Sequence, residues 1–557
     1  MTRTIRTVII GGGLSGITQA IRLKKELGDR VQITGSPGGV WRDSIWPEAG
    51  VDVPIHLYTL ETDLETDWRE YFAFQPDVLA YWLRLVDKYE LRDSFVFNSE
   101  YVGSHWDERT QTHSVTIRNT KTKAQTDITT EVLISATGPL AKRKFPNVPG
   151  LKDFKGAWFH NLDWDGSVKL EGRRIAVVGN GSSGVQIVPG LAKLPGTQVT
   201  HYIRSGGYFI PKIQREYTPW ERFAFQWIPG YLRWHRFGIL QEHDRHWSIK
   251  FSGDNKQREQ DERELLAYLR AKAPAKYLDA LTPTWPLGTK RPPLDLGWLD
   301  SLHWDNVELV NGALESVDAT GITVNGQHRD HDIIVYATGS DIGAHGLGAN
   351  TRLFGEGNLE LEQYWTSIGG PQAYAGIAVP RFPNYFTIIG PNSVAGSWGY
   401  TALRETAAVA RIVREILDYN LSSVQPKQAV FEHESEEIQK ELNKATIAVA
   451  GVDNYWRSPG GRITVNSPLS GIGLWWRTQR TRWGDWDAVR LVKGSDGKTR
   501  LQHVDVLAIK RRRAAVKALL VAALGATLYK RWDAVVAAFQ WAVKETGADK
   551  LLQHIRA

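Results

Sequence analysis

Two glycine-rich turns, each between a strand and a helix, constrain the fold of this chain most. The first spans Gly11 to Gly16, after the β-branched run Val8-Ile9-Ile10, and the second spans Gly179 to Gly184, after the apolar run 174–178. Both read G-x-G-x-x-G, in which the first glycine makes the bend, the second lets a pyrophosphate approach the backbone, and the third allows close helix–strand packing. One such turn is common in α/β proteins, but two in this context predict two dinucleotide sites. Their candidate residues are Gly11, Gly13 and Gly16 in the first turn, and Gly179, Gly181, Ser182, Ser183 and Gly184 in the second.

The order of the buried strands predicts how the two sites are arranged along the chain. Strand-like runs at 132–138 and 333–339 both end in Ala-Thr-Gly. Gly138, which closes the first run beside a proline-rich, basic linker, is a further candidate cofactor-binding residue. We therefore expect an α/β protein with two Rossmann-like dinucleotide-binding domains, the second inserted into the first. The predicted boundaries are 1–140 for the first part of one domain, 141–340 for the inserted domain, 341–500 for the return segment with the substrate pocket, and 501–557 for a basic helical extension.

The residue about 20 positions after the third glycine reports on the ribose of a bound dinucleotide. After Gly184 it is Arg204, which suits a 2′-phosphate and favours NADPH over NADH; the alternative is a surface arginine at a strand end. After Gly16 it is Ser36, and no acid stands nearby. Either the cofactor is held there without the usual carboxylate, or the loop has been shortened.

Composition and charge exclude several classes of protein. The chain is 42% hydrophobic and 23% charged, which is typical of a folded protein. Because it has no cysteine, disulfide frameworks, thiolate zinc sites, cysteine nucleophiles and disulfide reductases are excluded. The histidines show no metal-ligand spacing, so no metal is predicted. The net charge of +7 equals that of residues 510–557 alone, so nucleic-acid binding by the whole protein has little support.

The last part of the chain has a composition of its own. Lys510 and the three arginines after it lead into an Ala- and Leu-rich stretch that ends near Trp532. Such a helix suits shallow attachment to an anionic membrane surface, and the favoured alternative is a terminal helix pair packed on the protein or on another subunit. No signal peptide and no span of about 18 apolar residues is visible, so a cytoplasmic protein is expected.

Residues 154–165 carry the most specific motif, F-x-G-x-x-x-H-x-x-x-W-D. It resembles the fingerprint of the Baeyer–Villiger monooxygenases, and Trp164-Asp165 resembles their ending rather than that of heteroatom-oxidising relatives. The resemblance runs patchily from residue 8 to about 485. It implies FAD in the first domain, NADPH in the inserted domain, and O₂ and a small-molecule ketone as substrates, with ester or lactone formed through a C4a-peroxyflavin. The resemblance identifies neither the ketone nor the oligomeric state.

The same resemblance assigns roles to individual residues. Arg291 resembles the arginine that stabilises negative charge at the reacting oxygen atoms, and Asp52 its partner beside the flavin; the alternatives are a surface Lys-Arg pair and a turn aspartate. Lys290 is expected near the NADPH phosphate, or else in solvent. Trp41 and Tyr58 resemble flavin-pocket aromatics, with plain core residues as the alternative. Asn392, after Gly-Pro at an expected helix start, is a flavin contact or a turn former.

Two other functions stay open at this point: N- or S-oxidation by the same cofactors, and an NADPH oxidase or nucleotide-binding protein without monooxygenase activity. The single methionine, Met1, and the missing cysteines suit an enzyme exposed to peroxide, which oxidises both residue types. If the sequence is natural, close relatives should be equally poor in sulfur; ordinary contents among them would indicate engineering.

Overall fold

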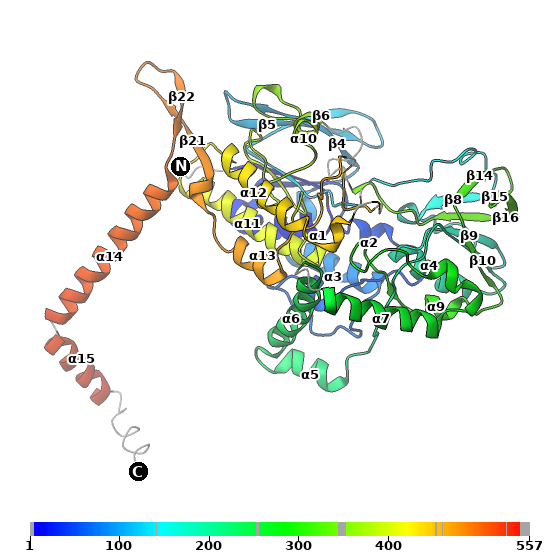
Figure 1. Ribbon diagram of the computed structural model, residues 1–557. Helices are drawn as coiled ribbons and strands as arrows, with labels where there is room; N and C mark the ends of the chain where they lie inside the picture. The colour runs from blue at the N-terminus through cyan, green and yellow to red at the C-terminus, as the bar shows by residue number, and fades with distance from the viewer. Residues whose placement is uncertain are drawn as a thin grey trace, which may run out of the picture. The chain divides into compact units, whose positions relative to one another are not determined.

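The computed structural model describes residues 5–140, 142–251, 255–342, 352–449, 451, 454–458, 460–530 and 532–545. The chain forms two compact units, one of residues 1–487 and one of residues 488–557. Figure 1 shows the course of the chain through both. The predicted boundaries at residues 140, 340 and 500 stay predictions.

Two parallel five-stranded sheets form the framework of the first unit. The first has the order β19-β7-β1-β2-β3, and the second has the order β13-β10-β9-β17-β8. The strands of the first sheet are β1 (Thr7–Ile10), β2 (Val31–Thr34), β3 (Phe95–Val96), β7 (Val132–Ser135) and β19 (Tyr385–Thr387). Those of the second are β8 (Ala157–His160), β9 (Arg174–Val178), β10 (Gln198–Ile203), β13 (Val307–Asn311) and β17 (Ile333–Tyr336). The parallel sheets confirm the predicted α/β class. All strands of the second sheet lie between β7 and β19 in the sequence, so the second domain is inserted into the first.

Smaller sheets, which the sequence reading did not predict, are added to this framework, and most of their strand pairs are antiparallel except β18 with β4 and β11 with β12. They comprise β4 (Ser99–Asp107), β5 (Thr112–Asn119), β6 (Gln125–Thr130) and β18 (Arg352–Phe354) in one sheet, and β14 (Leu314–Val317), β15 (Gly321–Val324) and β16 (Gln327–Asp330) in another. The short strands β11 (Ile210–Pro211) and β12 (Leu294–Asp295) pair in parallel.

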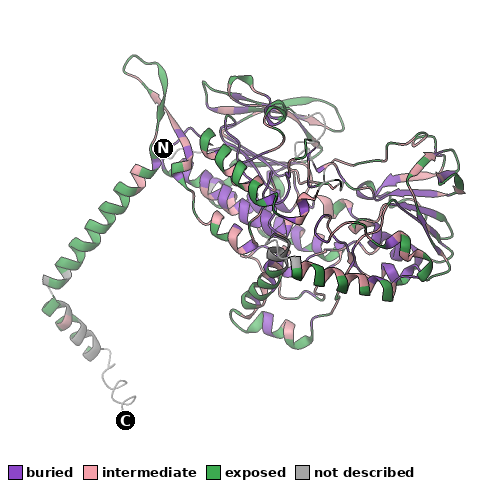
Figure 2. Cartoon of the chain, in the orientation of Figure 1, coloured by how far each residue is buried: buried purple, intermediate pink, exposed green. Residues whose placement is uncertain are grey.

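Helices pack against strands of both parallel sheets. The helices of the first unit are α1 (Leu14–Leu27), α2 (Val40–Asp43), α3 (Gln75–Lys88), α4 (Ser182–Ala192), α5 (Pro219–Trp227), α6 (Tyr231–Phe251), α7 (Asn255–Lys272), α8 (Leu278–Leu281), α9 (Trp298–Ser301), α10 (Leu361–Ser367), α11 (Trp398–Asp418), α12 (Gln428–Leu442) and α13 (Gly471–Thr478). Helix α1 packs against α11, and the strands and α11 are largely buried (Figure 2).

Alternate side chains along a strand determine where the apolar core of the inserted domain lies. Along β9, Ile175 and Val177 join one apolar cluster, while Ala176 and Val178 join another. Successive side chains of a strand point to opposite faces, so a strand covered by helices on one side and loops or strands on the other must be apolar throughout. This explains the continuous apolar runs from which the strands were predicted.

The second unit consists of a hairpin and two helices. Strands β21 (Trp486–Lys493) and β22 (Thr499–His503) pair antiparallel, and α14 (Val506–Lys530) and α15 (Trp532–Glu545) follow. The helices of this unit begin at Val506. The last part of the predicted helical extension, residues 546–557, lies outside the described residues. Among the helices that are described, none combines the length and apolarity that a bilayer crossing requires.

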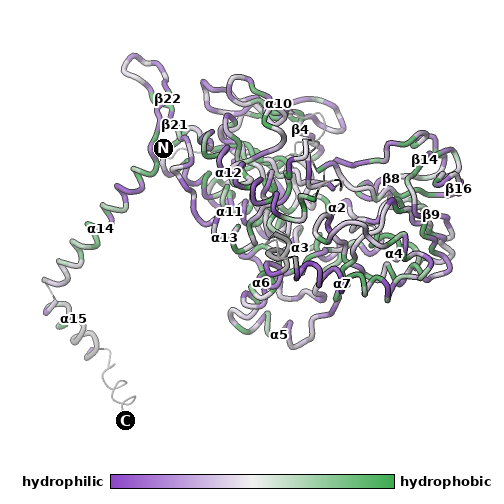
Figure 3. The backbone as a smooth tube through the Cα atoms, viewed as in Figure 1, coloured by the Kyte–Doolittle hydropathy of each residue, from purple (hydrophilic) through white to green (hydrophobic). Residues whose placement is uncertain are grey.

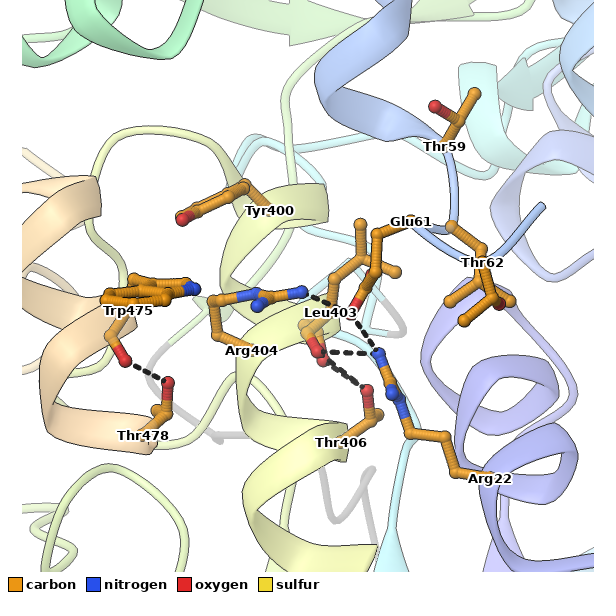
Figure 4. Close-up of polar contacts among 12 residues, drawn as sticks. Arg22, Thr59, Glu61, Thr62, Tyr400, Leu403, Arg404, Thr406, Trp475 and Thr478 are labelled. Carbon is orange, nitrogen blue, oxygen red and sulfur yellow. Dashed lines mark hydrogen bonds and ion pairs between the residues drawn. The ribbon is translucent and has the colours of Figure 1, made fainter. Parts of the chain in front are cut away.

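A buried ion cluster joins α1 to α11 (Figure 4). The carboxylate of Glu61 accepts from Arg22 of α1 at 2.7 Å and from Arg404 of α11. Arg22 also donates to the carbonyl of Leu403 at 3.3 Å. Burial raises the pKa of Glu61, but Arg404 and Arg22 outweigh that effect and hold the pKa at about 2. Glu61 therefore stays ionised between two largely buried guanidinium groups.

We expect Glu61→Gln to lower the free energy of unfolding by about 2–3 kcal/mol, because it leaves two largely buried cations without their anion. Since the folded pKa lies below the ordinary 4.5, this contribution is present above pH 4.5 and is lost as the pH falls toward 2. Thermal and urea unfolding followed by circular dichroism at several pH values would measure it. Glu100→Gln, which removes an exposed ion pair with Arg118, is the matched control with little expected effect; equal losses in both variants would contradict the assignment.

Candidate functional site

The first glycine turn has the geometry of a phosphate site. Gly11 adopts φ +105°, and a Cβ at Gly16 would lie 1.9 Å from the carbonyl oxygen of Gly11, so an alanine there requires the backbone to move. Helix α1 begins directly after Gly13, with neither a side-chain cap nor an acidic residue in its first turn. The positive end of the helix and its backbone N–H groups are thus available to an anion.

The second turn repeats this geometry. Gly179 adopts φ +107°, and a Cβ at Gly184 would lie 1.9 Å from the carbonyl oxygen of Gly179. Helix α4 begins after Gly181, again without a side-chain cap. The first glycine of each turn packs against an Ala-Thr-Gly strand end: Cβ atoms at Gly11 and Gly179 would each lie 2.5 Å from the alanine carbonyl oxygen. This contact explains why the two strand ends are alike. Both turns therefore fit a dinucleotide.

The loop after β2 packs directly on the first turn. A Cβ at Gly12 would lie 2.4 Å from the carbonyl oxygen of Ser36, one at Gly39 would lie 2.6 Å from Cα of Gly13, and the backbone N–H of Gly38 donates to the carbonyl of Gly12 at 3.0 Å. The loop is short, and the usual acid is absent from it. The site therefore offers a dinucleotide its turn and helix end, but no carboxylate for the ribose.

A cleft of about 650 Å³ connects the second turn with the predicted catalytic arginine. Its lining includes Asn180 and Gly181 from the turn, together with Lys290, Arg291 and Tyr455. Arg204 is exposed at the end of β10, next to the lining residue Ser205. Lys290 places its ammonium 4.0 Å from the ring centre of Trp285, which also lines the cleft.

Arg291 and Asp52 come from distant parts of the sequence and form an ion pair. The Nη2 atom of Arg291 lies 2.6 Å from Oδ2 of Asp52. The carboxylate of Asp52 raises the pKa of Arg291, and Arg291 also hydrogen-bonds to Tyr455. The pairing of these two residues agrees with the prediction, while their catalytic roles stay proposals.

Sequence reasoning missed Lys212, which stands close to this pair. It follows β11, and its ammonium lies 5.0 Å from the ring centre of Phe72. Burial lowers the pKa of Lys212 to about 8, against the opposing effects of Asp52, Glu70 and Glu48. Strand β12 follows Lys290 and Arg291 closely in the sequence. Its pairing with β11 brings Lys212 near Arg291 and Asp52. A lone lysine after an aromatic run carries no signal that could have predicted this.

The predicted aromatic pair is present. The indole N–H of Trp41 donates to the hydroxyl of Tyr58 at 3.0 Å, and the rings meet edge to face at 5.8 Å. Burial raises the pKa of Tyr58 to about 12, so the hydroxyl stays protonated. The Tyr58 ring also packs on α11, where a Cβ at Gly399 would lie 2.4 Å from it.

The expectation that Asn392 begins a helix is wrong. Helix α11 starts at Trp398, and Ser397 caps it by accepting from the N–H of Tyr400. Asn392 has φ +57°, and its amide donates to the carbonyls of Ile463 and Asn466 at 2.8 and 3.0 Å. The side chain fixes a turn, as the alternative reading had it.

Glu405, another residue that the sequence reading missed, supports the same turn. It is fully buried on α11, and its carboxyl group accepts from the backbone N–H of Ile389 at 2.5 Å. Burial raises the pKa of Glu405 to about 8. Ile389 is held at φ +59°, which is unusual for a β-branched residue.

The motif at residues 154–165 also makes contacts that hold the fold together. A Cβ at Gly156 would lie 2.4 Å from the carbonyl oxygen of Asp332. His160 is buried, and its Nε2 lies 2.9 Å from the carbonyl oxygen of Gly339, at the second Ala-Thr-Gly end. Trp164 packs on Phe159. The motif thus ties strand β8 to the second dinucleotide turn.

Known proteins resemble this chain over most of its length. The family described as Pyridine nucleotide-disulphide oxidoreductase matches residues 5–222, although the chain has no cysteine for disulfide chemistry. A protein of Mycobacterium bovis described as an uncharacterized monooxygenase is 30% identical, over 76% of this chain and 83% of its own length. A Baeyer–Villiger monooxygenase of Streptomyces coelicolor is 28% identical, over 87% of this chain and 93% of its own length.

Solved structures share the fold. The crystal structure of OTEMO in complex with FAD and NADP superimposes with a TM-score of 0.76 at 23% identity, covering 88% of this chain and all of that chain. The glycine turns, the Arg291–Asp52 pair and these relatives lead to one conclusion. The chain belongs to the flavin-dependent Baeyer–Villiger monooxygenases.

Proposed function

We propose that the protein converts a ketone, O₂ and NADPH with one proton into an ester or lactone, NADP⁺ and water. The observation that carries this proposal is the Arg291–Asp52 ion pair, because Arg291 lines the cleft that begins at the second dinucleotide turn. The reaction uses FAD at the first turn and NADPH at the second. A cytoplasmic location, which we propose, would supply the NADPH that the reaction consumes.

The protein's own residues supply position and charge in this proposal. FAD, when bound, supplies the redox chemistry and the activation of O₂. Arg291 is a fixed cation that stabilises the negative charge developing on the carbonyl oxygen of the ketone, and Asp52 holds its guanidinium in place. Trp41 and Tyr58 flank the isoalloxazine site, and Lys290 neutralises phosphate charge on NADPH.

Product analysis of the purified holoenzyme tests this function. We expect bound flavin, NADPH consumption that depends on a ketone, and an ester or lactone identified by mass spectrometry. A thioether in a parallel assay separates the heteroatom alternative, because sulfoxide without any ester would support that function instead. NADPH consumption that gives only hydrogen peroxide with a broad panel of ketones would contradict the proposal.

Arg204 is the residue proposed to distinguish NADPH from NADH. We expect Arg204→Ala to raise the KM for NADPH about 10- to 100-fold while leaving the KM for NADH nearly unchanged, because a charge-assisted contact to the 2′-phosphate is lost. Steady-state kinetics with both nucleotides would measure it. Arg173→Ala is the control, since Arg173 is exposed at the opposite end of the strands; an equal rise in KM for both nucleotides would contradict the assignment.

We also propose that the C-terminal helices contact an anionic membrane surface. Every residue from 511 to 527 is exposed, including Leu519 and Val521 at 70% and 71%. Helix α14 is hydrophilic at residues 510–513 and more apolar further along (Figure 3). Basic ends beside apolar sequence suit the headgroup region of a bilayer. Full-length protein with Leu519→Gln, Leu520→Gln and Val521→Gln should then bind vesicles more weakly; unchanged binding would contradict this.

A further inference from the structure

Helices α5 and α6 form a hairpin whose outer side chains are large, apolar and exposed. The hairpin lies at the lower edge of the first unit in Figure 1, and its outer faces are exposed in Figure 2. The exposed large residues on it are Trp220 at 65%, Phe223 at 49%, Trp227 at 64%, Ile228 at 40%, Trp234 at 69% and Phe237 at 49%. We call this set the aromatic hairpin surface. Several large apolar side chains exposed on one hairpin indicate an interaction site.

The other faces of the same helices are firmly packed, so the exposure does not arise from loose helices. Phe225 and His235 surround the buried ring of His56, with ring centres 5.1 and 5.4 Å away. Further along α6, Arg236 donates to the carbonyl of Thr59 at 2.9 Å. The carboxylate of Asp244 accepts from the N–H groups that begin α13, at 2.6 and 2.8 Å. The hairpin is therefore a rigid support for its outer aromatic side chains.

The charges on the hairpin point to an anionic lipid surface. Among the described side chains of α5 and α6, the exposed charged ones are Arg233, Glu242 and Arg245, and the last two form an ion pair with each other at 2.7 Å. The two half-buried charges of α5 are paired, Glu221 with Arg215 at 3.0 Å and Arg222 with Asp67 at 3.2 Å. Tryptophan prefers the boundary between headgroups and acyl chains, and cations beside it attract anionic headgroups. Three exposed tryptophans and the exposed Arg233 on one hairpin have this chemistry.

The placement of the aromatic residues favours a bilayer over a second copy of the chain. They lie on α5, on α6 and at the turn between them, where Ile228 precedes Pro229 and Gly230. A stable protein interface needs roughly 800 Å² of complementary surface on each partner, which suits a flat face better than side chains spread over two helices and their turn. A lipid surface deforms around such side chains and needs no complementary shape.

We propose that the aromatic hairpin surface docks on an anionic lipid bilayer, with its tryptophans in the headgroup region and Arg233 beside lipid phosphates. This surface belongs to the first unit. The proposal requires neither lipid contact by the C-terminal helices nor the oxygenase activity.

Vesicle co-sedimentation of the full-length holoenzyme tests the docking. The probes are phosphatidylcholine vesicles with and without phosphatidylglycerol. We expect the triple variant Trp220→Gln, Trp227→Gln and Trp234→Gln to bind the anionic vesicles at least about tenfold more weakly than the unchanged protein. Arg233→Glu should weaken binding to the anionic vesicles by about fivefold or more and should have less effect on neutral ones. The control variant, Trp304→Gln with Trp476→Gln, removes exposed tryptophans elsewhere, at 36% and 67% exposure, and should bind as the unchanged protein does.

Several outcomes would overturn the proposal. They are the absence of binding by the unchanged protein, equal binding by the triple variant, and a loss of binding that appears only when the C-terminal leucines are changed. Sedimentation velocity without lipid tests the competing occupant: a dimer that the triple variant converts to a monomer, without vesicle binding by either, would assign the surface to a second copy. Flavin content and circular dichroism establish that each variant is folded.

Discussion

Arg291→Ala is expected to retain FAD and NADPH-dependent flavin reduction but to lose ester formation by a factor of about 10³. The guanidinium is the charged group that we propose beside the developing oxyanion, and its loss leaves Asp52 there without a partner. Reducing equivalents should then leave as hydrogen peroxide. Stopped-flow flavin reduction, peroxide release and ester yield, measured on one preparation, would separate these steps.

The conservative variant sharpens this test. Arg291→Lys keeps a positive charge but lacks the planar fork of donors that can bind Asp52 and an oxygen atom together. We expect it to recover a small part of the ester yield. Arg270→Ala, an exposed arginine on α7, is the control with full activity. Ester formation by Arg291→Ala at the level of this control would refute the proposed role.

The parts of the fold that follow from local rules could be predicted from the sequence. A glycine turn needs only a strand before it and a helix after it, so both dinucleotide sites and the parallel sheets around them were predictable. The antiparallel strands β4 to β6 were missed, although apolar Val115 and Ile117 alternate with polar residues along β5. The start of α11 was wrong because Gly-Pro-Asn suggested a helix, whereas the capping side chain is Ser397.

The contacts in the functional site were harder to predict from a single sequence. Asp52 and Arg291 are far apart along the chain, and only the family resemblance placed them together. Nothing comparable pointed to Lys212, Glu405 or the Glu61 cluster, because their properties come from burial and from partners on distant elements. Local sequence patterns do not encode such pairings, which depend on how the two sheets and α11 pack.

The second large effect is expected when the third glycine of either turn is replaced by alanine. Each of the two dinucleotide sites serves as the control for the other. An alanine Cβ at Gly16 or Gly184 would lie 1.9 Å from the carbonyl oxygen of the first glycine in its turn. Because that atom is backbone, the strand and helix must separate, at a cost of about 3 kcal/mol or more. We expect Gly16→Ala to purify without FAD and to unfold at a lower temperature. Gly184→Ala should retain FAD but lose NADPH-dependent flavin reduction.

The second glycine of the NADPH turn separates a folding effect from a cofactor effect. A Cβ at Gly181 would meet nothing within 4 Å, and this glycine is not in the left-handed region. Gly181→Ala should therefore leave the melting temperature unchanged and weaken NADPH binding about tenfold or more, because only the bound pyrophosphate needs that space. Flavin absorbance, melting curves and NADPH titration would compare these variants with Gly484→Ala, which is remote from both turns and also unobstructed. Unchanged NADPH affinity in Gly181→Ala would show that the nucleotide does not approach α4, and FAD loss from Gly184→Ala would show that the two sites are not independent.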